Sequence, residues 1–144
     1  MGFTMTAKEY LKEYKELRIL IKLDEARLKE LEGMKDRISA NTTDERVQSS
    51  TIGSKVERLA VRIADLEQKI VDEKLEAVEK MTSIHESINR LDDVDEQIVL
   101  ELRYIRSMNF TSIAGDLGFS ISKVYRVHRR GVENISNIIP KHEI

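Results

Sequence analysis

The chain has 144 residues, of which 35% are charged and 5% are aromatic, and it contains a single proline and no cysteine. This composition is typical of long, solvent-exposed helices, and it excludes disulfide frameworks and thiolate metal sites. No apolar stretch is long enough to span a bilayer, so we expect a cytoplasmic protein without a membrane partner.

The formal net charge of −2 is unevenly distributed along the chain. Residues 1–96 carry a net charge of −5, whereas residues 97–144 carry a net charge of +3. A basic end on an acidic chain predicts a polyanionic partner for that end, and double-stranded DNA is the partner that we expect.

Residues 6–38 are predicted to form a long helix. Thr6 and Glu9 have the spacing of a capping box, in which both side chains accept hydrogen bonds from free backbone N–H groups. Apolar residues then recur at alternating spacings of four and three, which indicates a coiled-coil seam that Asp24 interrupts. The seam residues are Leu17, Ile21, Leu28 and Leu31.

A polar segment at residues 39–51 separates this helix from a second one, predicted over residues 52–91. Ser54 and Glu57 offer a capping box for it, and Thr51 could start it one turn earlier. The seam of the second helix contains Leu59, Ile63, Leu66 and Ile70. Two long helices joined by a loop of about a dozen residues fold back on each other, so residues 1–91 are expected to form an antiparallel helical hairpin.

The apolar surface of this hairpin is wider than one seam. Apolar side chains around Leu20 point over more than one face, and either the C-terminal domain or a second copy of the chain could cover the extra face. Self-association is the favoured interpretation, with a dimer as the favoured homo-oligomer. The residues expected to stabilise it are Leu17, Leu20, Ile21, Leu28, Leu31, Leu59, Ile63, Leu66 and Ile70.

Residues 92–144 are predicted to form a small helical domain. Asp93 is placed to cap its first helix, and the inward face of that helix is expected to carry Ile98, Leu102 and Ile105. The chain as a whole is therefore expected to be all-α, with a long hairpin followed by this domain.

A helix-turn-helix is predicted within the domain. Asn109 is placed to cap a short helix, Gly118 to end it in the left-handed conformation, and Ser120 to cap the last helix. Small and apolar residues occupy the positions of the motif's shared core. These positions are Ile113, Ala114, Leu117, Gly118, Phe119, Val124 and Val127. The outer face of the last helix is basic and polar with no acidic residue, whereas an ordinary solvated face mixes both signs.

The stretch from Asp95 to Ile135 resembles the region-four domain of bacterial primary sigma factors, whose last helix reads the −35 promoter element. The whole chain, from "AKEYLKEYKEL" through "SKVERLAVRIADLEQKI" to "ELRYIRSMNFTSIAGDLGFSISKVYRVHRR", resembles a family of small phage and prophage proteins. Members of that family are generally regarded as transcriptional regulators, often of late genes. The resemblance implies a sequence-specific DNA-binding regulator, with host RNA polymerase as a further candidate partner.

The resemblance also implies roles for individual side chains of the last helix. Ser122, Tyr125 and Arg126 fall where a sigma domain places base-contacting residues, and their three- and four-residue spacing puts them on one side of the helix. The residues expected at the DNA backbone are Ser120, Lys123, His128, Arg129 and Arg130.

Two other functional classes fit part of the pattern. Small terminase subunits of phages also join a helix-turn-helix to oligomerising helices, and a coiled-coil scaffold would use the hairpin without binding DNA. An enzyme is not expected, because the carboxylates lie at ion-pair spacings on helix surfaces without a nucleophile motif. His85, His128 and His142 are too scattered for a metal site, so we expect no metal, cofactor or small-molecule substrate.

Overall fold

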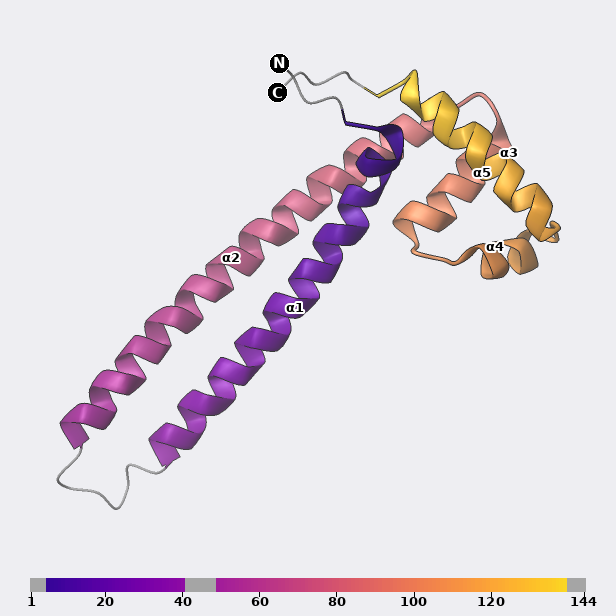
Figure 1. Cartoon of the computed structure of the whole chain (residues 1–144). Helices are drawn as coiled ribbons and strands as arrows, with labels where there is room; N and C mark the ends of the chain where they lie inside the picture. The colour runs from indigo at the N-terminus through magenta and orange to yellow at the C-terminus, as the bar shows by residue number, and fades with distance from the viewer. Residues whose placement is uncertain (1–4, 41–48, 140–144) are drawn as a thin grey trace. The chain divides into compact units, whose positions relative to one another are not determined.

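The computed structural model describes residues 5–40 and 49–139, and all the regular secondary structure of these residues is helical (Figure 1). The predicted all-helical fold is confirmed. The helices are α1 (Ala7–Ala40), α2 (Ser49–Asn89), α3 (Val94–Leu100), the π-helical turn η2 (Glu101–Ile105), α4 (Phe110–Leu117) and α5 (Ile121–Ser136). Most of the predicted polar segment, together with Pro140 and His142, lies outside the described residues.

The chain forms two compact units. We call Arg18–Glu76 the hairpin unit, and we call Met1–Leu17 together with Ala77–Ile144 the terminal unit. This division differs from the expected one between residues 91 and 92. The first turns of α1 and the last turns of α2 belong to the same unit as the C-terminal helices, because they share a core with them.

The first long helix begins as predicted, and the second begins earlier. The Thr6 hydroxyl accepts a hydrogen bond from the backbone N–H of Glu9 at 3.1 Å. The second helix, α2, starts at Ser49, about one turn before residue 52. Of the two predicted starts, the capping box at Ser54 is wrong and the earlier start at Thr51 is nearer to the observed one. The Ser54 hydroxyl accepts from Arg58 Nη1 at 3.4 Å, within the helix.

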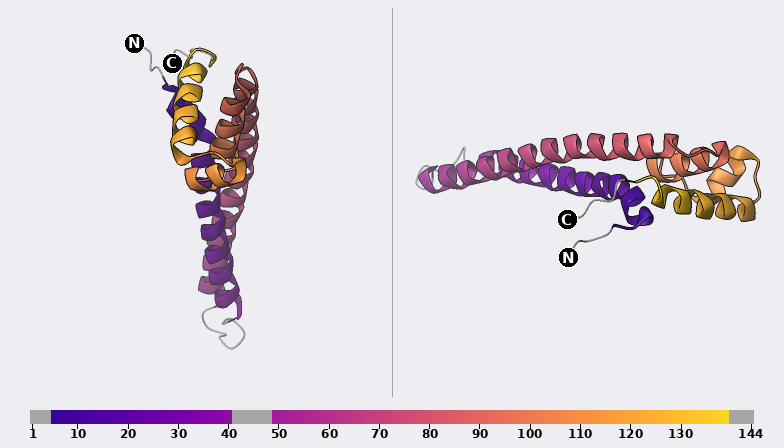
Figure 2. Two further views of the ribbon diagram at one scale, coloured as in Figure 1. Left: turned by 90° about the vertical axis from the view of Figure 1, so that its right-hand side faces the viewer. Right: turned by 90° about the horizontal axis from the view of Figure 1, so that it is seen from above.

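In the hairpin unit, the parts of α1 and α2 run side by side in opposite directions (Figure 1, Figure 2). Most of the predicted seam residues are buried or half-buried there, so they stabilise the hairpin within one chain. These are Ile21, Leu28, Leu31, Leu59, Ile63, Leu66 and Ile70. Leu20 is the exception, with 51% of its surface exposed, and its neighbours Ile19 and Leu23 are also exposed. Leu17 is buried in the terminal unit.

A charged cluster interrupts the seam of the hairpin unit at Asp24, which is only 2% exposed. Its carboxylate accepts from Arg27 Nη1 at 3.1 Å and forms an ion pair with Lys69 Nζ at 3.2 Å. Burial alone would raise the pKa of Asp24, but hydrogen bonds from Lys69 and Glu73 outweigh it and lower that pKa. Since sliding α1 along α2 would separate Asp24 from Lys69 and Glu73 of α2, the cluster fixes the register of the two helices.

The environment of the Glu73 carboxyl in this cluster disfavours its charged form. Burial, followed by its contact with Asp24, raises the pKa of the Glu73 carboxyl, and its Oε1 is buried with no hydrogen-bond partner among the described residues. A group with a raised pKa stabilises the fold at low pH and loses that contribution as the pH rises through the raised value. Asp24, with a lowered pKa, has the opposite effect and stabilises the fold above its unfolded pKa.

The terminal unit has its own apolar core, built from both ends of the chain. Its buried residues come from α1, α2, η2, the helices α3 and α5, and the α2–α3 connection. They are Ala7, Tyr10, Leu11, Ile84, Ile88, Leu91, Leu100, Tyr104, Ile105 and Ile135. The Tyr10 hydroxyl hydrogen-bonds with Ser83 Oγ at 2.7 Å and Ser87 Oγ at 2.9 Å, and Lys80 Nζ pairs with Glu13 Oε2 at 2.8 Å. The C-terminal helices therefore share this core with the ends of both long helices.

The first helix of the predicted C-terminal domain is not one continuous α-helix. It is capped by Asp93 Oδ1, which accepts from Glu96 N at 3.1 Å, but it changes to π winding after Leu100. Within η2 the N–H of Arg106 reaches the carbonyl of Glu101, five residues back. The extra residue per turn moves the inward face, so the prediction for Ile98 is wrong. Ile98 is 38% exposed, and Leu102 is half-buried.

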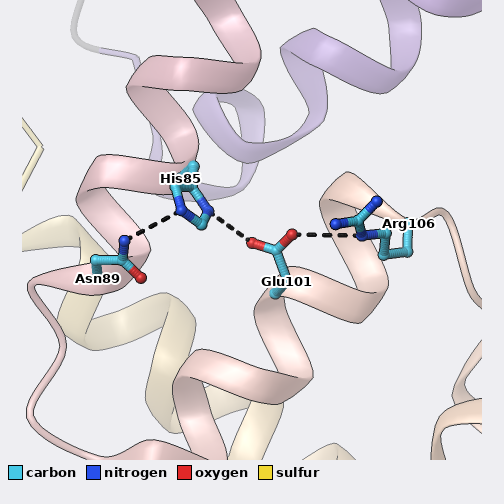
Figure 3. A network of polar contacts seen from close by, with 4 residues as sticks. All are labelled: His85, Asn89, Glu101 and Arg106. Carbon is cyan, nitrogen blue, oxygen red and sulfur yellow. Dashed lines mark hydrogen bonds and ion pairs between the residues drawn. The ribbon is translucent and has the colours of Figure 1, made fainter.

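A polar network holds the start of η2 to α2 (Figure 3). His85 Nδ1 lies 3.0 Å from Glu101 Oε1, Asn89 Nδ2 lies 3.2 Å from His85 Nε2, and Arg106 Nε lies 3.6 Å from Glu101 Oε2. With Nδ1–H donating to the carboxylate, Nε2 of the imidazole is free to accept from the amide. His85 is exposed on the surface and acts as a link between helices.

Gly131 allows α5 to approach α3 closely. It is buried, and a β-carbon at this position would lie 3.1 Å from Leu100 Cδ1 and 3.4 Å from Glu96 Cβ. Nearby, Asn134 Nδ2 donates to Glu96 Oε1 at 2.8 Å, which satisfies a carboxylate that is otherwise buried. Close packing on α3 fixes the position of α5 and of the side chains on its outer face.

Candidate nucleic-acid interface

The candidate interface lies on α5, which is joined to α4 by a short turn. Asn109 Oδ1 accepts from Ser112 N at 2.8 Å, and Ser120 Oγ accepts from Lys123 N at 3.1 Å, so side chains cap both helices. Gly118 ends α4 with φ 67°, a left-handed conformation that glycine adopts without strain. Together, the two caps and the glycine account locally for the break and restart of the helix.

An apolar cluster holds α4 and α5 against α3. Its buried members are Val99, Ile113, Ala114, Val124 and Val127, and Leu117 and Phe119 pack against them. Six of the seven positions expected to form the helix-turn-helix core lie in or against this cluster. The seventh, Gly118, is exposed at the turn. Because Val124 and Val127 face inward, the opposite face of α5 is presented to solvent.

That outer face is strongly basic. Ser122, Tyr125, Arg126, Arg129 and Arg130 are all exposed. Among the residues that the structure describes, no carboxylate lies within ion-pair distance of the three arginines. Side chains that carry uncompensated positive charge on one helix face provide what a phosphate backbone requires.

Lys123 differs from the arginines because it is held by its neighbours. Its Nζ lies 3.8 Å above the centre of the Phe119 ring and 4.0 Å from Asp95 Oδ2, and its side chain is half-buried. The cation–π contact and the distant ion pair both orient the ammonium group and partly neutralise it.

Tyr125 belongs to a cluster of packed aromatic rings. The Phe110 ring lies 4.8 Å from that of Tyr125 and 4.9 Å from the imidazole of His128, centre to centre. The hydroxyl of Tyr104 lies 2.7 Å from His128 Nε2. Neither this cluster nor the role of Tyr104 was predicted from the sequence, because the rings come from η2, α4 and α5 and follow no single helical spacing.

His128 is internal to this cluster and neutral at pH 7. Burial, with smaller contributions from the positive charges of Arg103 and Lys8, lowers the pKa of His128 to about 4. Burial also raises the pKa of Tyr104, so its hydroxyl keeps its proton at neutral pH, and the hydroxyl and His128 Nε2 share a hydrogen bond. A lowered histidine pKa stabilises the fold above the unfolded value and loses that contribution as the pH falls towards 4. The imidazole therefore has a structural partner in Tyr104, and its contact with a phosphate stays a prediction.

The part of the chain that the structure describes contains neither a metal-binding cluster nor a membrane-spanning helix. No group of three or more His, Asp or Glu side chains there is placed to hold a metal ion. None of the helices in residues 5–40 and 49–139 combines the length and the apolar character needed to cross a membrane.

Residues 37–136 match the model of a family described as "Protein of unknown function (DUF1492)". The chain belongs to this family. The DUF1492 match includes α2, α3, η2, α4 and α5, and therefore the whole outer face of α5. Most of α1 precedes the matched residues.

The chain is also similar to a curated protein, the probable kinetochore protein spc24 of Aspergillus oryzae. The two are 30% identical over 112 residues, which cover 78% of this chain. The aligned region spans only 50% of the length of that relative. No solved structure matches the chain.

Proposed function

We propose that this DUF1492 protein is a sequence-specific DNA-binding regulator of transcription, of the kind encoded by phages and prophages. The observation that supports this proposal is the exposed face of α5, where three arginines project without a neighbouring carboxylate. The α4–turn–α5 segment acts as a helix-turn-helix of the sigma region-four type, and α5 enters the major groove of double-stranded DNA. Host RNA polymerase is a further candidate partner.

In this proposal the outer face of α5 divides into two groups. Ser122, Tyr125 and Arg126 lie near the start of the helix, where side chains reach base edges, and Arg126 can donate to both acceptors of a guanine. Arg129, Arg130, Lys123 and the Ser120 hydroxyl contact the DNA backbone. His128 is a further expected backbone contact, and its Nε2 also hydrogen-bonds with the Tyr104 hydroxyl.

The dependence of DNA binding on salt tests this proposal. Each neutralised phosphate contributes about −0.9 to the slope of the logarithm of the binding constant against the logarithm of salt concentration, so the four cations of α5 contribute up to about −3.6. The measurement is a fluorescence-anisotropy titration of the full chain against a random duplex at several salt concentrations. A slope near zero would exclude DNA as the partner and favour a scaffold. A ring of many subunits in light scattering would favour a DNA-packaging subunit.

We also propose that the chain forms a homodimer through the hairpin unit. This proposal rests on the exposed apolar side chains of α1 and α2 in that unit, because isolated soluble helices seldom leave so many apolar groups in water. The residues concerned are Ile19, Leu20, Leu23, Val61, Val71 and Leu75. The seam residues themselves serve the hairpin, so of the nine positions expected to stabilise an oligomer, only Leu20 remains part of the proposed contact.

The double variant Leu20→Asp/Leu23→Asp should dissociate the dimer. Placing two carboxylates in a dry interface costs several kcal/mol, which should weaken association by more than about 100-fold. Sedimentation velocity at micromolar concentrations measures the change, and Met34→Asp on α1 is the control for an added charge at an exposed apolar position outside the proposed contact. If the unmodified chain sediments as a monomer, the dimer proposal is wrong.

A further inference from the structure

A cavity of about 270 Å³ lies in the terminal unit beside the outer face of α5. Three of the residues that line it are cations, namely Lys8 and Lys12 of α1 and Arg103 of η2. The remaining lining residues are Tyr104, Phe110, Tyr125 and His128. The described residues that form this cavity include no carboxylate, so the site combines positive charge with aromatic walls.

The two lysines are placed to receive an anion. Lys8 and Lys12 are four residues apart, which puts them on the same face of α1, and both are exposed. No carboxylate of the described residues lies within ion-pair distance of either ammonium group. Lys80 and Lys123 in the same unit differ in this respect, because they pair with Glu13 and Asp95.

Arg103 is fixed at the wall of the cavity. Its Nη1 donates to the carbonyl of Met108 at 3.1 Å, and its guanidinium carbon lies 4.3 Å from the centre of the Phe110 ring. A guanidinium held by one carbonyl and one ring keeps further N–H groups to donate, and it loses little conformational freedom when it binds. The positive charges of Lys8 and Arg103 also act together on His128, where both lower the imidazole pKa, so their fields converge on this cavity.

We propose that this cavity binds a phosphate group of the DNA backbone beside the groove entered by α5, with Lys8 and Lys12 as further phosphate contacts. This inference rests on the function proposed above. Tyr125 belongs both to the cavity wall and to the outer face of α5, so a duplex on that face brings its backbone to the cavity mouth. The first helix of the chain then contributes directly to DNA binding, through residues that precede those matched to DUF1492.

A backbone phosphate fits the site better than a free nucleotide does. The volume is slightly below the range of about 300–1,000 Å³ that is usual for small-molecule sites. Lysines on long exposed stems act as point charges that follow a backbone, whereas a buried nucleotide site would present a set of fixed polar groups to the base. Inorganic phosphate and nucleotides share the chemistry of the DNA phosphate, so the experiment has to separate these sources.

The test compares Lys8→Ala/Lys12→Ala with Lys22→Ala/Lys29→Ala in the full chain. Both pairs remove two charges from exposed positions of α1, and alanine preserves the helix. The first pair should reduce the magnitude of the salt slope by about 1.8 and weaken binding to random and selected duplexes alike, by about 10- to 30-fold at physiological salt. The control pair should change neither quantity. Lys8→Gln/Lys12→Gln should reproduce the result of the first pair.

The outcomes separate this inference from the function on which it rests. Salt-dependent binding by the unmodified chain, with an unchanged slope in Lys8→Ala/Lys12→Ala, would overturn the inference and leave the proposed function intact. No salt-dependent binding by the unmodified chain would overturn both. Calorimetric titrations with inorganic phosphate and with a deoxynucleoside monophosphate test the other sources. Saturable binding of either one that depends on Lys8 and Lys12, without a change in the DNA slope, would assign the cavity to a free ligand and overturn the inference.

Discussion

Replacing Arg126 by alanine should lower the affinity of the protein for its preferred DNA site by about 5- to 150-fold, because a bidentate contact to guanine discriminates by about 1–3 kcal/mol. Affinity for random duplexes should fall by less than about 5-fold, since only one positive charge is lost. Arg126 lies in the second turn of α5, is exposed, and has no carboxylate partner in the described part of the chain. Its guanidinium is therefore free to reach a base edge when α5 lies in the groove.

The measurement requires the preferred site, which selection from random duplexes with the full chain supplies. Titrations of that site, of its single-base variants and of random DNA then separate base contacts from backbone contacts. Arg129→Ala is the matched control, because it removes the same side chain from the same helix and should weaken binding to all sequences by a similar factor. Equal losses on preferred and random DNA for Arg126→Ala would show that Arg126 contacts phosphate and that its assignment as a base contact is wrong.

Features that depend on neighbouring residues in the chain could be predicted from the sequence. The caps at Thr6, Asp93, Asn109 and Ser120 each join a side chain to a backbone N–H three residues later, so the spacing alone identifies them. The left-handed conformation of Gly118 could also be predicted locally, because helices commonly end at a glycine in this conformation. The inward positions of Val124 and Val127 could be predicted because helical periodicity assigns residues to a face.

Features that depend on tertiary packing could not be predicted. Periodicity shows that a side chain is buried but does not show what buries it. The sequence therefore assigned the start of α1 and the end of α2 to a hairpin domain, whereas in the structure they complete the core of the terminal unit. The π winding of η2 leaves no pattern in the sequence, and neither does the contact of His85, itself bonded to Asn89, with Glu101 across the fold. The neutral state of His128 likewise follows from tertiary structure, because burial, with the positive charges of Arg103 and Lys8, lowers its pKa.

The Leu11→Ala variant should lower the free energy of unfolding of the terminal unit by about 2–5 kcal/mol. Leu11 is fully buried in the core that also contains Leu100 and Ile135, so the substitution leaves a cavity between α1 and the C-terminal helices. Met34→Ala is the control, because Met34 belongs to the same helix but is 43% exposed and lies outside the proposed dimer contact, so its loss should cost about 0.5 kcal/mol or less. Chemical denaturation measured by circular dichroism gives both values.

Hydrogen exchange shows how far the effect of Leu11→Ala spreads. Ile135 anchors the end of α5 in the core that Leu11 completes, so weakening that core should increase amide exchange along α5 as well as at the start of α1. Mass spectrometry of peptides from residues 121–136 measures this change, and the fold proposed for the terminal unit requires it. If exchange in α5 were unchanged while exchange at the start of α1 increased, the C-terminal helices would be a separate domain, as the sequence alone suggested. In that case the proposed phosphate contacts of Lys8 and Lys12 would have no fixed position relative to α5.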